Sequence, residues 1–239
     1  MDASPIALDR AALFLDFDGT LVEIAPRPDA VVVPEGLPAL LQRLAERMEG
    51  ALAIVSGRPL SQLDAFLPVP LAMAGDHGAS LRPTPGAAVE SPPLPAPPIA
   101  WREEAERFAA GFPGALVEPK GHGFVLHFRQ APEAGPPGRA LLEQLIAGSD
   151  AFLLMPAHMA WEVKPAAISK ATAVEGLMAR PPFAGRTPVY VGDDVTDEAG
   201  MDAARAAGGV GLRLQDAFGT PAGLRAWLAR LESAAVSRA

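Results

Sequence analysis

Two aspartates, Asp16 and Asp18, directly follow an apolar run in the stretch FLDFDGTL. The run is typical of a strand buried on both faces, and residues two apart on a strand point to the same side. We therefore expect both carboxylates to leave the carboxyl end of one strand, where open α/β sheets bind their ligands. Carboxylates this close repel one another, so that one must be protonated or both must share a cation. The alternative is a plain turn at Asp18 and Gly19 beside an exposed strand end.

A second group of acids follows another apolar run, in the stretch PVYVGDDVTDE. Asp193 and Asp194 stand directly behind the predicted strand, and we expect Asp193 to bind a metal ion. Asp197 and Glu198 have a second explanation, because Thr196 is a plausible helix N-cap and acids are favoured in the first turn of a helix.

Two further places offer groups that suit a phosphate. The predicted strand ending in IVSGR supplies the Ser56 hydroxyl and the Gly57 amide, although a Ser-Gly pair is also a common turn. Lys170 follows Ser169, a plausible N-cap, so this lysine faces the positive end of the helix dipole. A phosphate fits a helix N-terminus and would explain the lysine, whereas a solvated lysine is the alternative.

These residues together predict phosphoryl transfer through an aspartyl-phosphate. Asp16 is the expected nucleophile, and Asp18 is the expected acid and base for the leaving group and the attacking water. Oxygen ligands that leave room for water suit Mg²⁺. The expected ligands are Asp16, Asp18, Asp193 and Asp194.

The elements that must position these residues alternate between strand and helix. Short apolar runs predict strands at 11–17, 51–57, 71–79, 187–194 and 209–214, and helical spacing predicts helices at 34–50, 59–67, 169–179, 196–208 and 221–233. This alternation predicts an α/β fold with a doubly wound, mostly parallel sheet. Gly50 is expected to end the first of these helices.

The middle of the chain follows a different pattern. Residues 82–98 hold seven prolines and are expected to form a linker or surface segment. Two helices and four strands with short turns follow, which predicts an antiparallel sheet covered by two helices. We expect an inserted cap domain at 80–162, dividing a core made of residues 1–79 and 163–239.

The strands of the inserted domain have one apolar and one polar face. Glu118 and Lys120 share a face of one strand, and His127 and Arg129 share a face of the next, opposite Phe124, Leu126 and Phe128. Glu162 and Lys164 repeat this pattern opposite Trp161 and Val163. We expect this polar face to bind sugar hydroxyls, and an ordinary solvated face is the alternative. His77, between Gly75 and Gly78, is expected to be a loop residue near the active site.

Composition limits the class of protein. The 239 residues are 49% hydrophobic and 6% aromatic, with a net charge of -8, which is typical of an acidic globular protein and argues against a nucleic acid partner. The first residues lack a signal-peptide pattern, and the apolar runs are too short to span a bilayer. We expect a cytoplasmic monomer that acts on a small molecule. The absence of cysteine excludes disulfides and a thiolate nucleophile.

The motifs DFDGTL, SGR, Lys170 and GDDVTDE, in this order, resemble the four motifs of the haloacid dehalogenase superfamily, and the inserted domain is similar to its larger αβ cap. GDDVTDE together with GDHGA, VEPKGHGFVLHFR and WEVKP narrows the resemblance to the trehalose-6-phosphate phosphatase family. The resemblance covers nearly the whole chain. Ala171 departs from the pattern, because a glycine usually follows the lysine.

The resemblance implies hydrolysis of trehalose 6-phosphate to trehalose and phosphate. It also implies that Asp16, the Asp18 carbonyl and Asp193 bind Mg²⁺, and that Ser56 and Lys170 hold the phosphate. Another sugar phosphatase, a phosphomutase or a catalytically silent sugar-phosphate sensor are the alternatives. The residues expected to bind substrate are Thr20, Gly57, Arg58, His77, Glu118, Lys120, His127, Arg129, Glu162 and Asp197.

Overall fold

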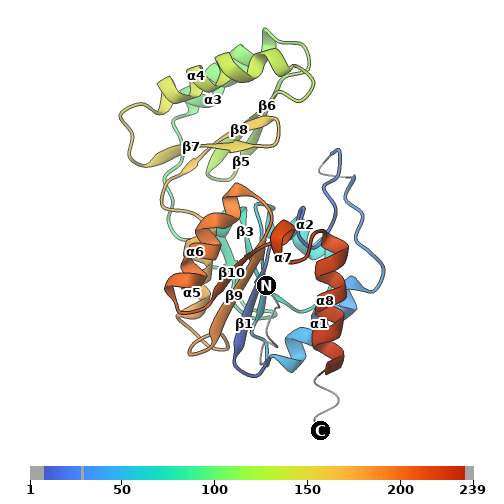
Figure 1. The fold of residues 1–239 in the computed structure, drawn as a ribbon. Helices are drawn as coiled ribbons and strands as arrows, with labels where there is room; N and C mark the ends of the chain where they lie inside the picture. The colour runs from blue at the N-terminus through green and yellow to red at the C-terminus, as the bar shows by residue number, and fades with distance from the viewer. Residues whose placement is uncertain (1–7, 28–29, 235–239) are drawn as a thin grey trace. The chain divides into compact units, whose positions relative to one another are not determined.

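The protein is described by a computed structural model covering residues 8–27 and 30–234. The chain divides into two compact units (Figure 1). The core unit contains the residues up to Pro92 and those from Ser169 onward, and the insert unit is Pro93–Ile168. Both boundaries lie later in the chain than the sequence analysis placed them, because 80–82 and 163–165 belong to strands of the core and insert sheets respectively.

The core unit is built on a six-stranded sheet with the strand order β10-β9-β1-β2-β3-β4. All neighbouring strands are parallel except β3 and β4, which are antiparallel. This confirms the predicted mostly parallel sheet. The strands are β1 (Ala11–Leu15), β2 (Leu52–Val55), β3 (Ala72–Gly75), β4 (Ser80–Arg82), β9 (Thr187–Gly192) and β10 (Val210–Arg213).

Helices cover both faces of the core sheet. Figure 1 shows α5 and α6 on one face, and α1 and α8 on the other. All five residues of β1 are buried, as a central strand covered by helices on both sides requires. The core helices are α1 (Leu37–Arg47), α2 (Leu60–Phe66), α5 (Lys170–Met178), α6 (Glu198–Ala206), α7 (Leu214–Ala217) and α8 (Pro221–Ala234).

Helix α1 shows why the apolar spacing was a reliable signal. Its buried residues, Leu37, Leu40, Leu41, Leu44 and Ala45, recur at three- and four-residue intervals and face the core. The C-cap is Met48, so Gly50 lies two residues beyond it and is not the cap that the sequence predicted. Gly50 has a φ of 90°, which favours glycine, and its N–H donates to the Ala45 carbonyl at 2.7 Å.

The insert unit is an antiparallel sheet of order β5-β6-β8-β7 with two helices, α3 (Ile99–Ala110) and α4 (Gly135–Ile146). Phe124, Leu126 and Val163 are fully buried in the hydrophobic core of this unit. On the same face, Trp161 donates its indole N–H to the Gly135 carbonyl at 2.8 Å. The predicted two-layer architecture is confirmed. The strands are β5 (Leu116–Lys120), β6 (Gly123–His127), β7 (Phe152–Ala157) and β8 (Ala160–Pro165), and a 3₁₀ turn η3 (Pro132–Ala134) precedes α4.

The proline-rich segment is attached to the core unit over its first half. Leu81 and Glu90 exchange two backbone hydrogen bonds of 2.8 Å, which adds a bridge to β4. Both carboxylate oxygens of Glu90 also accept hydrogen bonds from Arg180 at 2.7 Å. The part of this segment beyond Glu90 therefore forms the connection to the insert unit.

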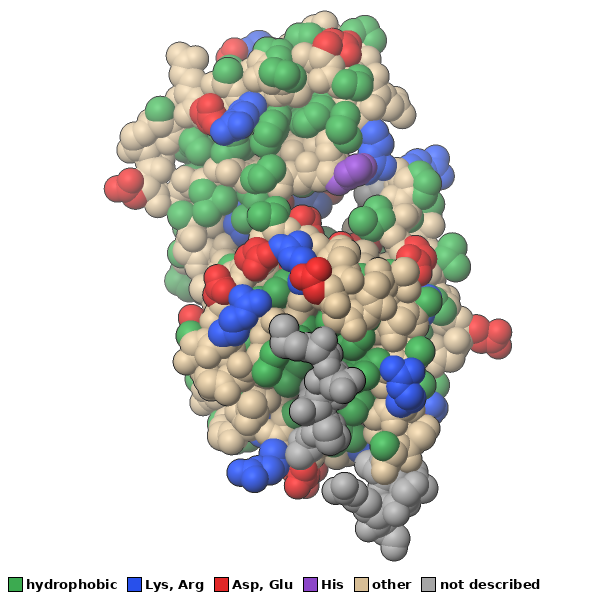
Figure 2. Space-filling model, in the orientation of Figure 1, with side chains coloured by type: hydrophobic (Ala, Val, Ile, Leu, Met, Phe, Trp, Pro, Cys, Tyr) green, Lys and Arg blue, Asp and Glu red, His purple; other side chains and the backbone are tan. Residues whose placement is uncertain are grey.

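The molecular surface carries mixed charges. Figure 2 shows acidic and basic side chains interspersed with apolar and neutral groups on the visible face. Among residues 8–27 and 30–234, no helix has both the length and the apolar character needed to span a bilayer.

Candidate active site

Three of the predicted site residues lie at one edge of the core sheet. Asp16 follows β1, Ser56 follows β2, and Asp193 follows β9. β1 pairs in parallel with both β2 and β9, so the carboxyl ends of these strands meet at the same edge. Backbone hydrogen bonds continue past the strand ends, since Asp16 N donates to the Val191 carbonyl at 3.0 Å. The sheet therefore brings these residues together as the sequence predicted.

Lys170 points into the core unit and contacts two carboxylates. Its Nζ donates to Asp16 Oδ1 at 2.7 Å and to Asp197 Oδ1 at 2.5 Å. All three residues are buried, with exposures of 4% for Lys170, 4% for Asp16 and none for Asp197. Ser169 is the N-cap of α5, as predicted, and it forms a capping box with Thr172. The alternative of a solvated lysine is therefore wrong.

Asp197 accepts four hydrogen bonds inside the core unit. Its Oδ1 accepts from Lys170 and from the Tyr190 hydroxyl at 2.7 Å, and its Oδ2 accepts from the backbone N–H groups of Asp193 and Asp194 at 3.1 Å each. A fully buried carboxylate with both oxygens engaged does not reach a sugar. Asp197 therefore does not have the substrate-binding role that the sequence predicted. Instead, it joins Lys170 to the turn that carries Asp193.

The turn after β9 is also capped differently from the prediction. The 3₁₀ turn η4 (Val195–Asp197) starts from Asp194, whose Oδ1 accepts the Val195 N–H at 2.5 Å. Thr196, the expected cap, lies inside this turn. Asp194 is exposed and serves as the cap, which separates it from the buried carboxylates.

The buried charges perturb one another. Burial raises the pKa of Asp16 well above its usual range, Lys170 opposes this rise, and the nearby Asp197 and Asp193 reinforce it. Burial alone would lower the pKa of Lys170, but the carboxylates of Asp16 and Asp197 raise it. The pKa of Asp193 is raised by burial and by the Asp197 and Asp194 charges, although its bond from Thr20 opposes the rise. One buried ammonium thus faces an excess of negative charge.

The carboxylates have the chemistry of a site for a hard cation. One oxygen from each of Asp16, Asp193 and Asp197 lies within 4.8 Å of the others. Protein donors engage both oxygens of Asp197, whereas the hydrogen bonds to Asp16 and Asp193 reach Oδ1. Asp16 and Asp193 therefore fit a cation such as Mg²⁺ better than Asp197 does.

Thr20 and Gly19 fix the position of Asp193. The buried Thr20 hydroxyl donates to Asp193 Oδ1 at 2.7 Å. Gly19 has a φ of 80°, and a Cβ placed there would lie 2.3 Å from Asp193 Oδ2. Only glycine lets the backbone after Asp18 approach this carboxylate so closely. Thr20 thus orients Asp193 inside the core unit and does not have the substrate-binding role that the sequence predicted.

The structure separates the two aspartates of the opening motif. Asp18 lies beyond the last residue of β1, and Arg58 holds its carboxylate through Nε at 2.5 Å and Nη2 at 2.7 Å. Asp16 contacts Lys170 instead. The rule that alternate residues share a face does not apply past the end of a strand, and the two carboxylates here contact different partners. Arg58, expected to bind substrate, orients Asp18.

His77 lies beside Ser56 and Gly57, the phosphate-binding candidates that follow β2. Its N–H donates to the Ser56 carbonyl at 3.0 Å, within the 3₁₀ turn η2 (Asp76–Gly78). A Cβ at Gly57 would lie 2.6 Å from Cε1 of the His77 ring. Gly57 therefore makes room for this imidazole.

The polar face of the insert sheet contains a small charged cluster. Glu118 accepts from Lys120 Nζ at 2.6 Å, and its other oxygen lies 2.8 Å from His127 Nε2. The bond with His127 lowers the pKa of Glu118 to about 2, with Lys120 adding to the effect and burial opposing it. Glu162 is on the same face, because Glu118 and Glu162 both pair in register with Val125. Arg129 is exposed and lies beyond the end of β6, so strand alternation does not place it.

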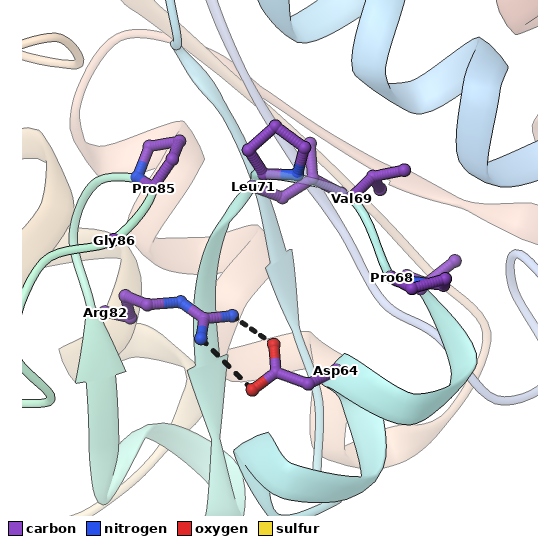
Figure 3. A pocket seen from close by; sticks show the side chains of 9 residues that line it. Asp64, Pro68, Val69, Leu71, Arg82, Pro85 and Gly86 are labelled. Carbon is purple, nitrogen blue, oxygen red and sulfur yellow. Dashed lines mark hydrogen bonds and ion pairs between the residues drawn. The ribbon is translucent and has the colours of Figure 1, made fainter.

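A separate cavity of about 270 Å³ lies at the opposite end of β3, beside Leu71 and Pro85 (Figure 3). Arg82 and Asp64 line it and form two hydrogen bonds of 2.5 and 3.1 Å with each other. Their charges compensate, and the predicted phosphate-binding residues lie at the other edge of the sheet.

Comparisons with known proteins identify the family of the chain. Residues 14–215 match the family model described as Trehalose-phosphatase. The trehalose-6-phosphate phosphatase of Escherichia coli (strain K12) is 39% identical over 219 residues, which cover 90% of this chain and 80% of the relative.

Solved structures show the same fold. Aspergillus fumigatus trehalose-6-phosphate phosphatase has a TM-score of 0.61 at 22% identity, covering 94% of this chain and 93% of that one. A haloacid dehalogenase-like hydrolase from Bacteroides thetaiotaomicron has a TM-score of 0.63 at 14% identity, covering 93% and 99%. The expected haloacid dehalogenase fold is confirmed. The chain, matched by the family model over most of its length, belongs to the trehalose-phosphatase family.

Proposed function

We propose that the protein hydrolyses trehalose 6-phosphate to trehalose and phosphate through an aspartyl-phosphate on Asp16, with Mg²⁺ as its cofactor. The observation that carries this proposal is the buried contact of Lys170 with Asp16, at the sheet edge that also carries Asp193. A carboxylate nucleophile beside the fixed ammonium group of Lys170 suits attack on a dianionic phosphate group.

In the first step, a carboxylate oxygen of Asp16 attacks phosphorus, and the bond from phosphorus to the sugar oxygen breaks. Asp18 gives its proton to that oxygen, so the sugar leaves as an alcohol. Lys170 and the Ser56 hydroxyl hold the phosphoryl oxygens. In the second step, Asp18 takes a proton from water, the water oxygen attacks phosphorus, and the bond to Asp16 breaks.

The contact between Arg58 and Asp18 bears on both proton transfers. Arg58 engages both oxygens of the Asp18 carboxylate. Each carboxylate oxygen has two acceptor sites, so a site for the proton remains on either oxygen while both bonds to Arg58 are kept. Arg58 therefore sets the orientation in which Asp18 transfers the proton.

The residues that would hold the cation are Asp16, Asp193 and the carbonyl group of Asp18. When bound, Mg²⁺ would withdraw charge from the phosphoryl group as a Lewis acid. Thr20 and Gly19 already orient Asp193 for this task. Asp194 caps η4 and is left out of the proposed ligand set.

The polar face of the insert sheet is proposed to bind the sugar. Glu118, Lys120, His127 and Glu162 supply donors and acceptors on one face of three adjacent strands. Partly exposed charged groups can exchange their bonds with water for bonds with sugar hydroxyls. The fully buried residues of the core unit do not have this freedom.

Phosphate release tests the proposal. We expect rapid release from trehalose 6-phosphate in millimolar Mg²⁺, almost none after chelation of the metal, and much slower release from glucose 6-phosphate. Equal rates on both esters would indicate a general sugar phosphatase. An absence of release from either ester would indicate a sugar-phosphate sensor instead of an enzyme.

A further inference from the structure

Tyr190 is the single tyrosine of the sequence, and the predicted chemistry gave it no role. It lies in the middle of β9, next to the central strand, and is fully buried. Its hydroxyl donates to Asp197 Oδ1 at 2.7 Å. Lys170 contacts the same oxygen at 2.5 Å, so one carboxylate oxygen joins the tyrosine to the lysine of the active site.

The fold makes specific room for this ring. Gly200 lies within α6, where glycine is unfavourable compared with alanine. A Cβ at Gly200 would lie 2.5 Å from Cε2 and 2.7 Å from Cζ of Tyr190. The glycine lets the helix pack directly on the ring and keeps the hydroxyl at Asp197.

The hydrogen bonds of Asp197 divide into two pairs with different effects. Oδ2 is bound to the backbone of Asp193 and Asp194, which fixes the carboxylate to the turn after β9. Oδ1 is shared between Lys170 and Tyr190. Without the phenol, Oδ1 would interact with the ammonium alone and would draw it away from Asp16.

We propose that Tyr190 is a positioning residue that acts through Asp197 to hold Lys170 between Asp197 and Asp16. This role rests on the proposed function of Lys170 in phosphoryl transfer. Tyr190 touches no reacting atom, because it is fully buried and its polar contact is with Asp197. It contributes by placing the Lys170 ammonium group, which contacts the phosphoryl group in the proposed reaction.

The single tyrosine provides a direct spectroscopic test. Protein labelled with ¹³C at Cζ of tyrosine gives one signal, and Tyr190→Phe confirms its assignment by removing it. We expect the signal to shift when inorganic phosphate and Mg²⁺ are added together, and to shift also in Lys170→Ala. A signal that moves in neither case would overturn the proposal, whether or not the protein proves to be a phosphatase.

Kinetics of paired variants provide the second test. Tyr190→Phe is expected to lower kcat about 10-fold, equivalent to about 1.4 kcal/mol, with KM changed by less than about twofold. Gly200→Ala, which pushes the ring from its place, is expected to act in the same direction. In an Asp197→Asn background, Tyr190→Phe should change kcat by less than about twofold, because the route to Lys170 is already broken.

A control separates positioning from stability. Leu44→Ala removes a fully buried side chain from α1, away from this network, and should lower the melting temperature without lowering kcat at 25 °C. The proposal would be overturned if Tyr190→Phe lowered kcat equally in the Asp197→Asn background, or if it did not lower kcat in the wild-type background.

Discussion

A cluster of shared charges is described in each unit of the protein, and the two clusters differ in burial. In the core unit, one ammonium is shared by two carboxylates, and the side chains of Lys170, Asp16 and Asp197 are at most 5% exposed. In the insert unit, one carboxylate is shared by two nitrogen groups, and Glu118 is 39% exposed. Water can replace a lost partner in the second cluster but cannot do so in the first.

The difference indicates two kinds of task. A buried cluster cannot rearrange without leaving a charge uncompensated, so its geometry is fixed before the substrate arrives. The exposed cluster can exchange water for hydroxyl groups at little cost. We therefore expect substitutions in the core cluster to stop the chemistry, and substitutions in the insert cluster to change which phosphate ester is preferred.

Asp16→Asn should have the largest effect. The substitution keeps the shape and removes the attacking charge, so kcat should fall on the order of 10⁴-fold or more. The melting temperature in metal-free buffer should not fall, because the excess of carboxylates around Lys170 is reduced. Phosphate release and thermal denaturation measure the two effects. Turnover within tenfold of the wild type would contradict the proposed nucleophile.

Arg58→Met should have the next largest effect, because it removes both hydrogen bonds that hold the Asp18 carboxylate. We expect kcat/KM for trehalose 6-phosphate to fall about 10- to 100-fold, within the range for general acid–base catalysis. An aryl phosphate with a stable leaving group needs little proton donation, so its hydrolysis should fall less than about threefold.

Arg82→Met is the matched control for Arg58, since it breaks the similar two-bond pair with Asp64 at the other end of the core sheet. It should leave both activities unchanged. Equal losses on the two esters for Arg58→Met would show that Arg58 does not act through Asp18.

Glu118→Ala should affect only the sugar ester. Losing a hydrogen bond between a charged group and a hydroxyl costs about 1.5 to 3 kcal/mol, or roughly 10- to 100-fold in kcat/KM for trehalose 6-phosphate. A small aryl phosphate lacks those hydroxyls and should be hydrolysed at nearly the wild-type rate. Glu104→Ala, which removes the partner of Arg107 on α3, is the control. A parallel loss on both esters would mean that the insert face is structural.

The smallest effect concerns stability in acid. The folded-state pKa of Glu118, about 2, lies below the usual value, so its ionised form stabilises the fold above pH about 4.5. This contribution declines as the pH falls from about 4.5 to 2. The difference in urea midpoint between the wild type and Glu118→Gln should therefore narrow between pH 7 and pH 3. A constant difference would show that the ion pairs contribute nothing.

Local patterns in the sequence predicted most of the fold. Strand β1 and helix α1 were evident from apolar spacing, and the Ser169 cap was evident from residue type, because each depends on interactions within a few residues. Strand β4 was missed because its three residues are held by β3 and by a bridge to Glu90, neither of which leaves a local pattern.

Long-range contacts explain what the sequence did not show about the site. The residues that perform the proposed chemistry could be picked out by type, but the partners that orient them could not. Thr20 is 173 positions from Asp193, and Arg58 is 40 positions from Asp18. In the sequence, Tyr190 is an ordinary residue of a predicted apolar strand. Only the folded contacts show that each of these residues fixes a carboxylate.

The central position of β1 has a consequence for the synthesis of the protein. One edge of this wholly buried strand pairs with β2, but its other edge pairs with β9, where Ala11 faces Thr187. On the ribosome, β1 to β4 and the entire insert unit emerge before β9 is available. During that interval the nascent chain presents an unpaired apolar strand edge, which is a template for aggregation. Translation speed between the two strands, or a chaperone that covers this edge, should therefore influence the yield of native protein.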